Sequence, residues 1–159
     1  MSLYANTVNW FSTTRLGGWI ARRLAARVDP FLYRVSGGRF TSTGTLTIPQ
    51  LVLTTIGRKT GEARTVQLGY FADGGDFVIV ASNFGQPRHP AWAYSLLANP
   101  AASIYVDGHD VGVHARQVSD DEKSALWPRL VRVIPRFGVY VTRTHRNVKV
   151  FRLTPDATS

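Results

Sequence analysis

Hydrophobic residues recur at every fourth position near the start of the chain, at Leu16, Ile20, Leu24 and Val28. This spacing puts them on one face of a helix, while several arginines occupy the other faces. The pattern therefore predicts a basic amphipathic helix. Asp29-Pro30, which resembles an N-cap and a first-turn proline, predicts a second short helical turn directly afterwards.

From Ile48 onward the pattern changes to short apolar or alternating runs, which are typical of β-strands. These runs predict six strands, at residues 51–56, 64–71, 77–82, 102–106, 111–118 and 148–153. Two turns, DGGD at residues 73–76 and DGHD at residues 107–110, supply the glycine and aspartate that tight hairpins need. Six short strands of this kind indicate a barrel, preceded by a glycine-rich loop at residues 36–45.

Two helices interrupt the predicted strands. The first follows Pro90 and ends before Asn99-Pro100. The second opens at Ser119, with Glu122 three residues later as a capping box, and runs towards Pro135. The fold class is therefore mainly β with α (α+β).

Composition limits the domain count and the kinds of partner. A chain of 159 residues with 44% hydrophobic residues fits a single domain. We expect residues 1–45 to form the basic helical segment and loop, and residues 46–155 to form the barrel. The formal net charge of +9 favours an anionic partner. The chain has no cysteine, which excludes disulfides and thiol chemistry.

The apolar runs also bear on location and on membrane contact. No stretch of this sequence approaches the roughly 18 consecutive apolar residues of a membrane-spanning helix. The default expectation is a cytoplasmic protein. Peripheral membrane contact through the basic amphipathic helix is an alternative, because such helices can lie in the interface. The sequence does not indicate an oligomeric state.

The most chemically suggestive feature is a turn between two predicted strands, in which Gly57 and Gly61 bracket Arg58, Lys59 and Thr60. Glycine lets the backbone approach a ligand, while a guanidinium, an ammonium and a hydroxyl can donate to phosphate oxygens. The spacing is not that of a nucleotide triphosphatase loop, which ends in Gly-Lys-Ser/Thr before a helix. The turn is either a phosphate-binding hairpin tip or a solvated basic one.

A second candidate segment runs from residue 81 to residue 100, ASNFGQPRHPAWAYSLLANP. It leaves a predicted strand, crosses a loop and enters a helix at Pro90. The start of a helix offers free backbone amides and a partial positive charge, which suit an anion. Trp92 alone would be a core residue, but two such loops in one small domain favour a shared ligand.

The carboxylates do not indicate hydrolysis, because most lie in predicted turns or at helix starts, where each has a local structural role. His109 and His114 straddle a turn without acidic neighbours, so we assign no metal. The arginines are scattered and carry no stacking motif, so nucleic acid is not a predicted partner.

Taken together, TTIGRKTGEAR, SNFGQPRHPAW, LLANP and the final strand resemble the deazaflavin-dependent nitroreductases of actinobacteria, which are relatives of the split-barrel flavin oxidoreductases. The resemblance covers about residues 48–153. It implies an FMN-binding-like split β-barrel that binds the deazaflavin coenzyme F420, whose phosphate and oligoglutamate tail would explain the basic charge. By this resemblance the phosphate is held by Arg58, Lys59, Thr60 and Arg64. The resemblance implies that the ring is lined by Ser82, Asn83, Gly85, Pro90, Ala91 and Trp92, and that Gln67 and Ser95 are further cofactor-binding positions.

Some positions depart from the family pattern. Gln67 stands where a proline is common, and Ser95 replaces a frequent asparagine. The aromatic cluster that shapes the substrate pocket in drug-activating members corresponds to Ile134, Phe137 and Tyr140, so a tyrosine is kept only at the last position.

The resemblance implies an F420-dependent oxidoreductase that transfers a hydride to an electron-poor small molecule: a quinone, a nitroaromatic or an enone. In this hypothesis Tyr140, Ser82 or water delivers the accompanying proton. Two alternatives stay open at this point. One is an oxidoreductase that uses FMN, which also carries a phosphate, and the other is a non-catalytic protein of the same fold that binds lipids or membranes.

Overall fold

The computed structural model describes residues 27–28, 30–35, 37, 40–41, 44–45, 48–142, 144 and 146–157. The predicted amphipathic helix lies outside the described residues, except for its last two positions, 27 and 28, which are helical. Residues 30–35 are also helical, as the proline at position 30 predicts.

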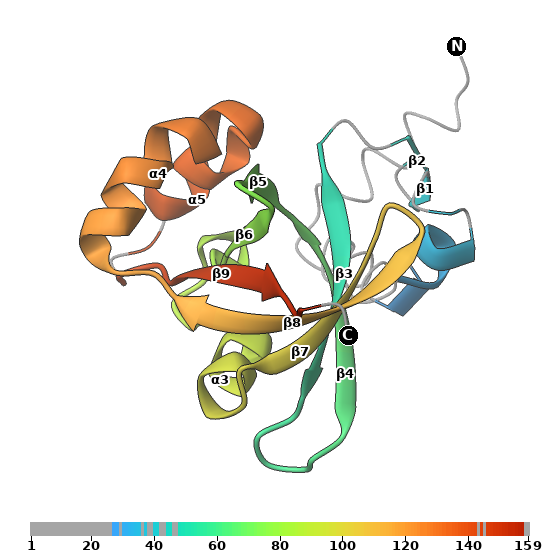
Figure 1. Ribbon diagram of the computed structural model, residues 1–159. Helices are drawn as coiled ribbons and strands as arrows, with labels where there is room; N and C mark the ends of the chain where they lie inside the picture. The colour runs from blue at the N-terminus through green and yellow to red at the C-terminus, as the bar shows by residue number, and fades with distance from the viewer. Residues whose placement is uncertain are drawn as a thin grey trace, which may run out of the picture.

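The described residues form one curled sheet of seven antiparallel strands in the order β4-β3-β7-β8-β9-β6-β5 (Figure 1). The bounds are β3 Gln50–Ile56, β4 Ala63–Gly69, β5 Phe71–Asp73, β6 Asp76–Val80, β7 Ala101–Val106, β8 His109–Gln117 and β9 Val150–Pro155. A separate small ribbon pairs β1 Phe40–Thr41 with β2 Gly44–Thr45. The curled sheet is a split β-barrel, which confirms the predicted fold class.

Helices cover the sheet at two places. The helical elements are η1 Asn83–Gly85, α3 Ala91–Ala98, α4 Asp120–Val133 and α5 Arg136–Thr142. Helix α3 packs against β3 and β8, whereas α4 and α5 contact each other at the opposite side of the sheet (Figure 1). None of the described helices has the length and apolar character needed to cross a membrane.

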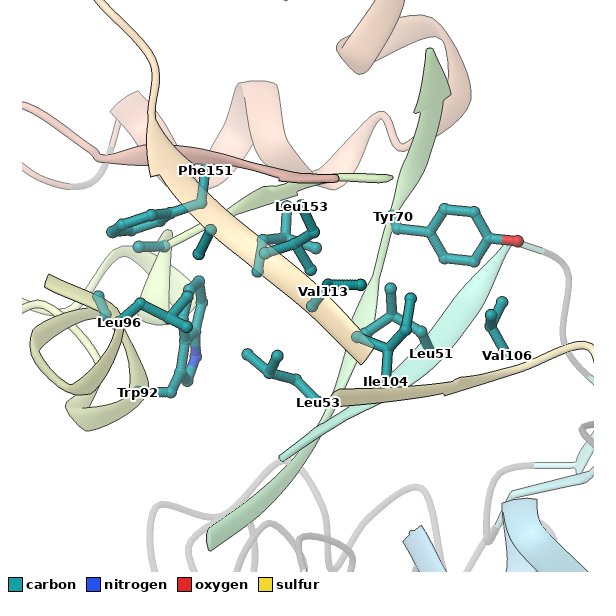
Figure 2. Packing of buried hydrophobic residues seen from close by; sticks show 14 residues of the cluster. Leu51, Leu53, Tyr70, Trp92, Leu96, Ile104, Val106, Val113, Phe151 and Leu153 are labelled. Carbon is teal, nitrogen blue, oxygen red and sulfur yellow. The ribbon is translucent and has the colours of Figure 1, made fainter. Parts of the chain in front are cut away.

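Strand alternation divides the core into two layers. Ile79 of β6 belongs to the main core cluster, with Leu53, Phe151 and Trp92 of α3. Figure 2 shows the last three side chains in this layer. Val78, next to Ile79 in the chain, faces the other way into the layer under α4 and α5. A fully buried side chain of this size stabilises the fold by about 1.5–3 kcal/mol. Helix α3, which carries part of the candidate site, is thus fixed by the main core.

Several local predictions were wrong in detail, including the end of the strand predicted at 77–82 and the start of that predicted at 111–118. The predicted strand 64–71 is two strands, because the chain turns at Tyr70, whose amide donates to the carbonyl of Pro49 at 3.1 Å. The predicted loop 36–45 contains the β1–β2 ribbon. Helix α5 was missed, and the last strand starts at residue 150 rather than 148.

The predicted capping box of α4 is half formed. The Ser119 hydroxyl accepts a hydrogen bond from the amide of Glu122 at 3.2 Å, as predicted. The Glu122 carboxylate, however, bonds to Arg116 and Arg152. The helix therefore begins where the sequence predicts, while its first-turn acid joins an ion-pair network.

Candidate functional site

A cleft of about 620 Å³ lies between the β3–β4 turn and the N-terminal half of α3. Its lining includes four cations, from Arg58, Lys59, Arg64 and Arg88. Seven of the sequence-predicted site residues meet in this cleft: Arg58, Lys59, Thr60, Arg64, Ala91, Trp92 and Ser95. The two segments that the sequence singled out are therefore neighbours in the fold.

The β3–β4 turn is held in shape by its own backbone. The amide of Gly57 donates to the carbonyl of Glu62 at 2.8 Å, and the amide of Gly61 donates to the carbonyl of Gly57 at 2.8 Å. Gly61 has a φ of +71°, a conformation that side chains rarely adopt. A Cβ atom at Gly57 would lie 3.0 Å from Oγ1 of Thr60. The turn thus requires glycine at both positions that bracket its cationic side chains.

The cations of the turn have only weak partners. The Arg58 guanidinium lies 4.9 Å from the ring centre of Tyr94, a cation–π contact across the cleft. Arg64 pairs with Glu62 at 3.3 Å, but both side chains are mostly exposed. An exposed pair of this kind contributes little stability, so the guanidinium is readily released to a ligand.

The α3 wall combines apolar and polar surface. Trp92 is buried, and its ring packs edge-on against that of Phe151, with 5.8 Å between the ring centres (Figure 2). It therefore belongs both to the core and to the lining of the cleft. The Ser95 hydroxyl donates to the carbonyl of Ala91 at 3.2 Å. A wall of this composition suits a planar aromatic ligand, because apolar surface and ring faces stack well.

The remaining predicted residues adjoin the cleft without lining it. Ser82 is buried and begins the short turn η1, and Pro90 is the N-cap of α3. Asn83 and Gly85 have positive φ angles of 45° and 76°. The amide group of Asn83 donates to the carbonyl of Arg88 at 2.8 Å, which closes the loop between these elements.

One predicted residue lies elsewhere, and the side chain of another is not described. Gln67 follows the outer alternation of β4, opposite the face of Val66, and its side chain donates to that of Gln50 at 2.5 Å. Its own side-chain oxygen is buried without a partner. Tyr140 lies in α5, and its side chain is outside the described part of the chain.

Several residues that the sequence reasoning did not select also line the cleft. Arg88, His89 and Tyr94 come from the loop and the first turns of α3, and Thr55 and Val66 come from the strands. Tyr94 was within reach of the sequence, because it follows Ala91 by three positions and shares its helix face. That Thr55 and Val66 line the cleft can be predicted only once the register of β3 and β4 is known.

The one histidine among the described lining residues has a shifted pKa. Burial lowers the pKa of His89 below its usual value, and the charges of Arg146 and Lys149 lower it further. Among the described residues no group of three histidine, aspartate or glutamate side chains is arranged to hold a metal ion.

A split β-barrel with a cationic turn and an aromatic wall around one cleft defines a protein of the flavin-type coenzyme-binding class. The chain matches the family model described as F420H(2)-dependent quinone reductase over residues 25–155. The chain belongs to this family. It is an F420-dependent oxidoreductase, and its family implies a quinone-type hydride acceptor.

Individual relatives agree with the family. An F420H(2)-dependent quinone reductase of Mycobacterium tuberculosis is 36% identical over 143 residues, which cover 86% of this chain and 95% of the relative. The solved structure of the F420-H2 dependent reductase FDR-A is 32% identical with a TM-score of 0.61, covering 66% of this chain and 93% of that one. A structure described as a domain-swapped dimer is 29% identical with a TM-score of 0.63, covering 78% and 94% of the two chains.

The residues present fit F420. The coenzyme carries a phosphate and an anionic tail, and the cleft offers four cations and the hydroxyl of Thr60 as donors. It also carries a planar ring, for which Trp92 and Val66 provide apolar wall. Carboxylates, which would repel such a ligand, are absent among the described lining residues.

Proposed function

We propose that the cleft binds F420 with its phosphate on the β3–β4 turn and its ring towards α3, and that the acceptor is a quinone. The observation that carries this proposal is the meeting of Arg58, Lys59 and Arg64 with Trp92 in a single cleft. A cationic turn alone would equally suit a solvated loop. Its position opposite a buried aromatic wall supports a ligand that is anionic at one end and planar at the other.

When bound, reduced F420 supplies the hydride. The cations of the turn fix the anionic end by charge-assisted hydrogen bonds. Ala91, Trp92 and Val66 exclude water from the other end, which keeps the acceptor and the coenzyme in contact. The chain needs no carboxylate dyad for this work, since orientation and desolvation are its main contributions.

Proton delivery belongs to Ser82, Tyr140 or water in this proposal. Ser82 is buried at the start of η1, close in sequence to the loop beside the cleft. Tyr140→Phe removes only a hydroxyl, so an unchanged turnover number across the pH range would exclude this tyrosine as the donor.

The coenzyme site is tested by the double variant Lys59→Ala/Arg64→Ala. Charge-assisted hydrogen bonds are worth about 1.5–3 kcal/mol each, so we expect the F420 dissociation constant to rise by at least about tenfold. The measurement is quenching of F420 fluorescence on titration with the protein, with FMN titrated in parallel.

A matched control is Arg132→Ala/Arg136→Ala, which removes the same net charge from exposed positions in α4 and α5. We expect F420 affinity close to wild type in this control at moderate salt, because exposed distant charges are screened. Equal loss in both double variants would reduce the proposed site to a nonspecific effect of net charge. Tight binding of FMN would favour the flavin alternative.

We further propose a cytoplasmic enzyme with peripheral membrane contact through its N-terminal part. In support, Phe31 and Val35 are one helical turn apart and are 66% and 70% exposed, next to the exposed Arg34. Co-sedimentation of the full chain with anionic but not neutral vesicles is expected. If the chain co-sediments with neither kind of vesicle, this contact is refuted.

A further inference from the structure

Arg146 lies in the segment between α5 and β9 and holds the loop beside the cleft. One terminal nitrogen of its guanidinium donates to the carbonyl of Ser82 at 2.7 Å, and Nε donates to the carbonyl of Gln86 at 3.1 Å. The other terminal nitrogen lies 2.9 Å from Nδ1 of His89. All three nitrogens of one side chain are thus used on a single short loop, residues 82–89.

The contact with His89 fixes the protonation of the imidazole ring. An arginine side chain is always charged and can only donate hydrogen bonds. Nδ1 of His89 must therefore be the acceptor, which puts the single proton of the neutral ring on Nε2. A protonated His89 would carry a donor on both nitrogens and would lose this bond to Arg146.

His89 connects Arg146 to residues that line the cleft. Its ring meets that of Tyr94 edge-on at 5.8 Å, and Tyr94 lies under the guanidinium of Arg58. His89, Tyr94 and Arg58 all line the cleft, whereas Arg146 does not. The contacts run without a gap from Arg146 to the phosphate-binding turn, across both halves of the proposed coenzyme site.

The loop needs such support because its backbone is unusual. Asn83, a residue with a side chain, has a φ of +45°, and Gly85 has a φ of +76°. The left-handed region is unfavourable for a residue other than glycine, and less so for asparagine. The two carbonyls held by Arg146, of Ser82 and Gln86, flank this turn on either side.

We propose that Arg146 is a positioning residue of the coenzyme cleft, which clamps the loop 82–89 and holds His89 as the Nε2-protonated ring against Tyr94. The inference rests on the proposed function for the identity of the ligand. The clamp itself is a property of the protein without ligand and can be tested as such.

The clamp has a consequence for pH. The charged groups around His89 are cations: Arg146 and Lys149 from the segment before β9, Arg88 beside it in the loop, and Arg58 beyond Tyr94. Protonation of His89 therefore breaks one hydrogen bond and adds repulsion. The added charge alone would attract an anionic coenzyme, but release of the loop disturbs the contacts of His89 with Tyr94 and of Tyr94 with Arg58. We expect the second effect to be larger, so that coenzyme affinity falls at acidic pH, below the usual histidine pKa of about 6.5.

The first test uses the protein without coenzyme. Ring-nitrogen NMR at pH 7.5 should show His89 protonated on Nε2 only, with its signals assigned by their loss in His89→Asn. Arg146→Met removes the donors and keeps the stem, and should raise the pKa of His89 and mix its tautomers. Arg132→Met is the matched control. A His89 ring that carries its proton on Nδ1, or titrates alike in wild type and Arg146→Met, would overturn the clamp.

The second test measures F420 affinity by fluorescence quenching from pH 5 to pH 8. Arg146→Met should raise the dissociation constant by about fivefold, the equivalent of roughly one net hydrogen bond, and Arg146→Lys should recover part of the loss. In His89→Asn the amide oxygen still accepts from Arg146 but cannot be protonated. This variant should lose the acidic fall in affinity that wild type shows, and comparison of the two cancels any titration of the coenzyme.

The outcomes separate the two proposals. No F420 binding by wild type, together with the expected NMR result, would refute the proposed coenzyme site and leave the clamp standing. Tight F420 binding that is the same in wild type, Arg146→Met and His89→Asn at every pH would refute the positioning role. If Arg146→Met does not fold, Arg146→Lys and His89→Asn give the same comparison.

Discussion

At the scale of single residues, the site depends on backbone space as much as on charge. The turn that carries Arg58 and Lys59 is closed by hydrogen bonds to the backbone of Gly57. The missing side chain of Gly57 leaves room for the hydroxyl of Thr60 and the carbonyl of Glu62. The cations can point into the cleft because the backbone beneath them is compact.

Gly57→Ala should therefore weaken coenzyme binding. The new Cβ would lie 3.0 Å from Oγ1 of Thr60 and 3.3 Å from the carbonyl oxygen of Glu62, so the turn must shift. Crowding of this kind costs about 1–3 kcal/mol, and we expect a loss of F420 affinity of about fivefold or more. Fluorescence titration at constant salt measures it.

Gly74→Ala is the control for this prediction. Gly74 has a φ of +59° and open space around it, in the β5–β6 hairpin. Its substitution should lower stability through backbone strain alone and leave F420 affinity unchanged. If both alanine variants bind F420 like wild type, the shape of the turn does not matter for binding.

Residues also show how far the sequence predicts the site. Arg58, Lys59 and Arg64 were predictable because chemistry and spacing coincide within a few positions. Arg146 was not, because it is 57 to 64 positions from the residues it holds and nothing in its local sequence marks it. The long-range contacts of a single polar side chain produce no periodic pattern in the sequence.

At the scale of elements, sequence signals succeeded where they are local. The hairpins at residues 73–76 and 107–110 form as predicted, since their glycine and aspartate residues suit tight turns. Helix α5 was missed because Pro135 marks an end and the following residues, RFGVYVT, include glycine and β-branched residues that favour other structures. Packing of Phe137 in the second core layer outweighs this weak propensity.

Ser119→Ala tests the best local signal, the start of α4. The variant loses the hydrogen bond from the amide of Glu122, and caps of this kind contribute about 1 kcal/mol. For a chain of this size we expect the melting temperature to fall by about 2–4 °C. Thermal unfolding followed by circular dichroism measures it.

Ser119→Thr retains a hydroxyl that can accept the same hydrogen bond, and should recover most of the lost stability. If the alanine variant has the same melting temperature as wild type, the ion pairs of Glu122 alone hold the first turn of α4.

At the scale of the whole molecule, one ion-pair network joins parts that are distant in sequence. Arg152 of β9 is only 15% exposed and bonds to Asp73 at 2.8 Å, to Asp76 at 3.1 Å and to Glu122 at 3.1 Å. Asp73 also pairs with Arg129 of α4 at 2.6 Å. The network thus connects the β5–β6 hairpin, α4 and the inner strand β9.

Stability should fall in acid because of this network. Hydrogen bonds from Arg152 and Arg129 lower the pKa of Asp73, and the hydrogen bond from Arg116 lowers that of Glu122. A lowered folded-state pKa means that the stabilisation is complete above the unfolded pKa, about 4, and is lost as the pH falls below it. Urea unfolding at pH 7, 4 and 3 should show a decreasing free energy of unfolding.

Arg152→Met is the comparison for this pH series. It removes the shared partner of both acids, so the fall in stability between pH 7 and pH 3 should be smaller than in wild type. An identical fall in both proteins would assign the acid sensitivity to carboxylates outside the network.

The position of β9 also bears on synthesis in the cell. This strand is the last in sequence order among those described, yet it lies between β8 and β6 inside the sheet. Until it leaves the ribosome, β5 and β6 have no neighbour to connect them to the rest of the sheet. The sheet of the nascent chain therefore cannot be completed, and stays accessible to chaperones, until about residue 155 has emerged. A premature stop before β9 removes the strand that connects β8 to β6.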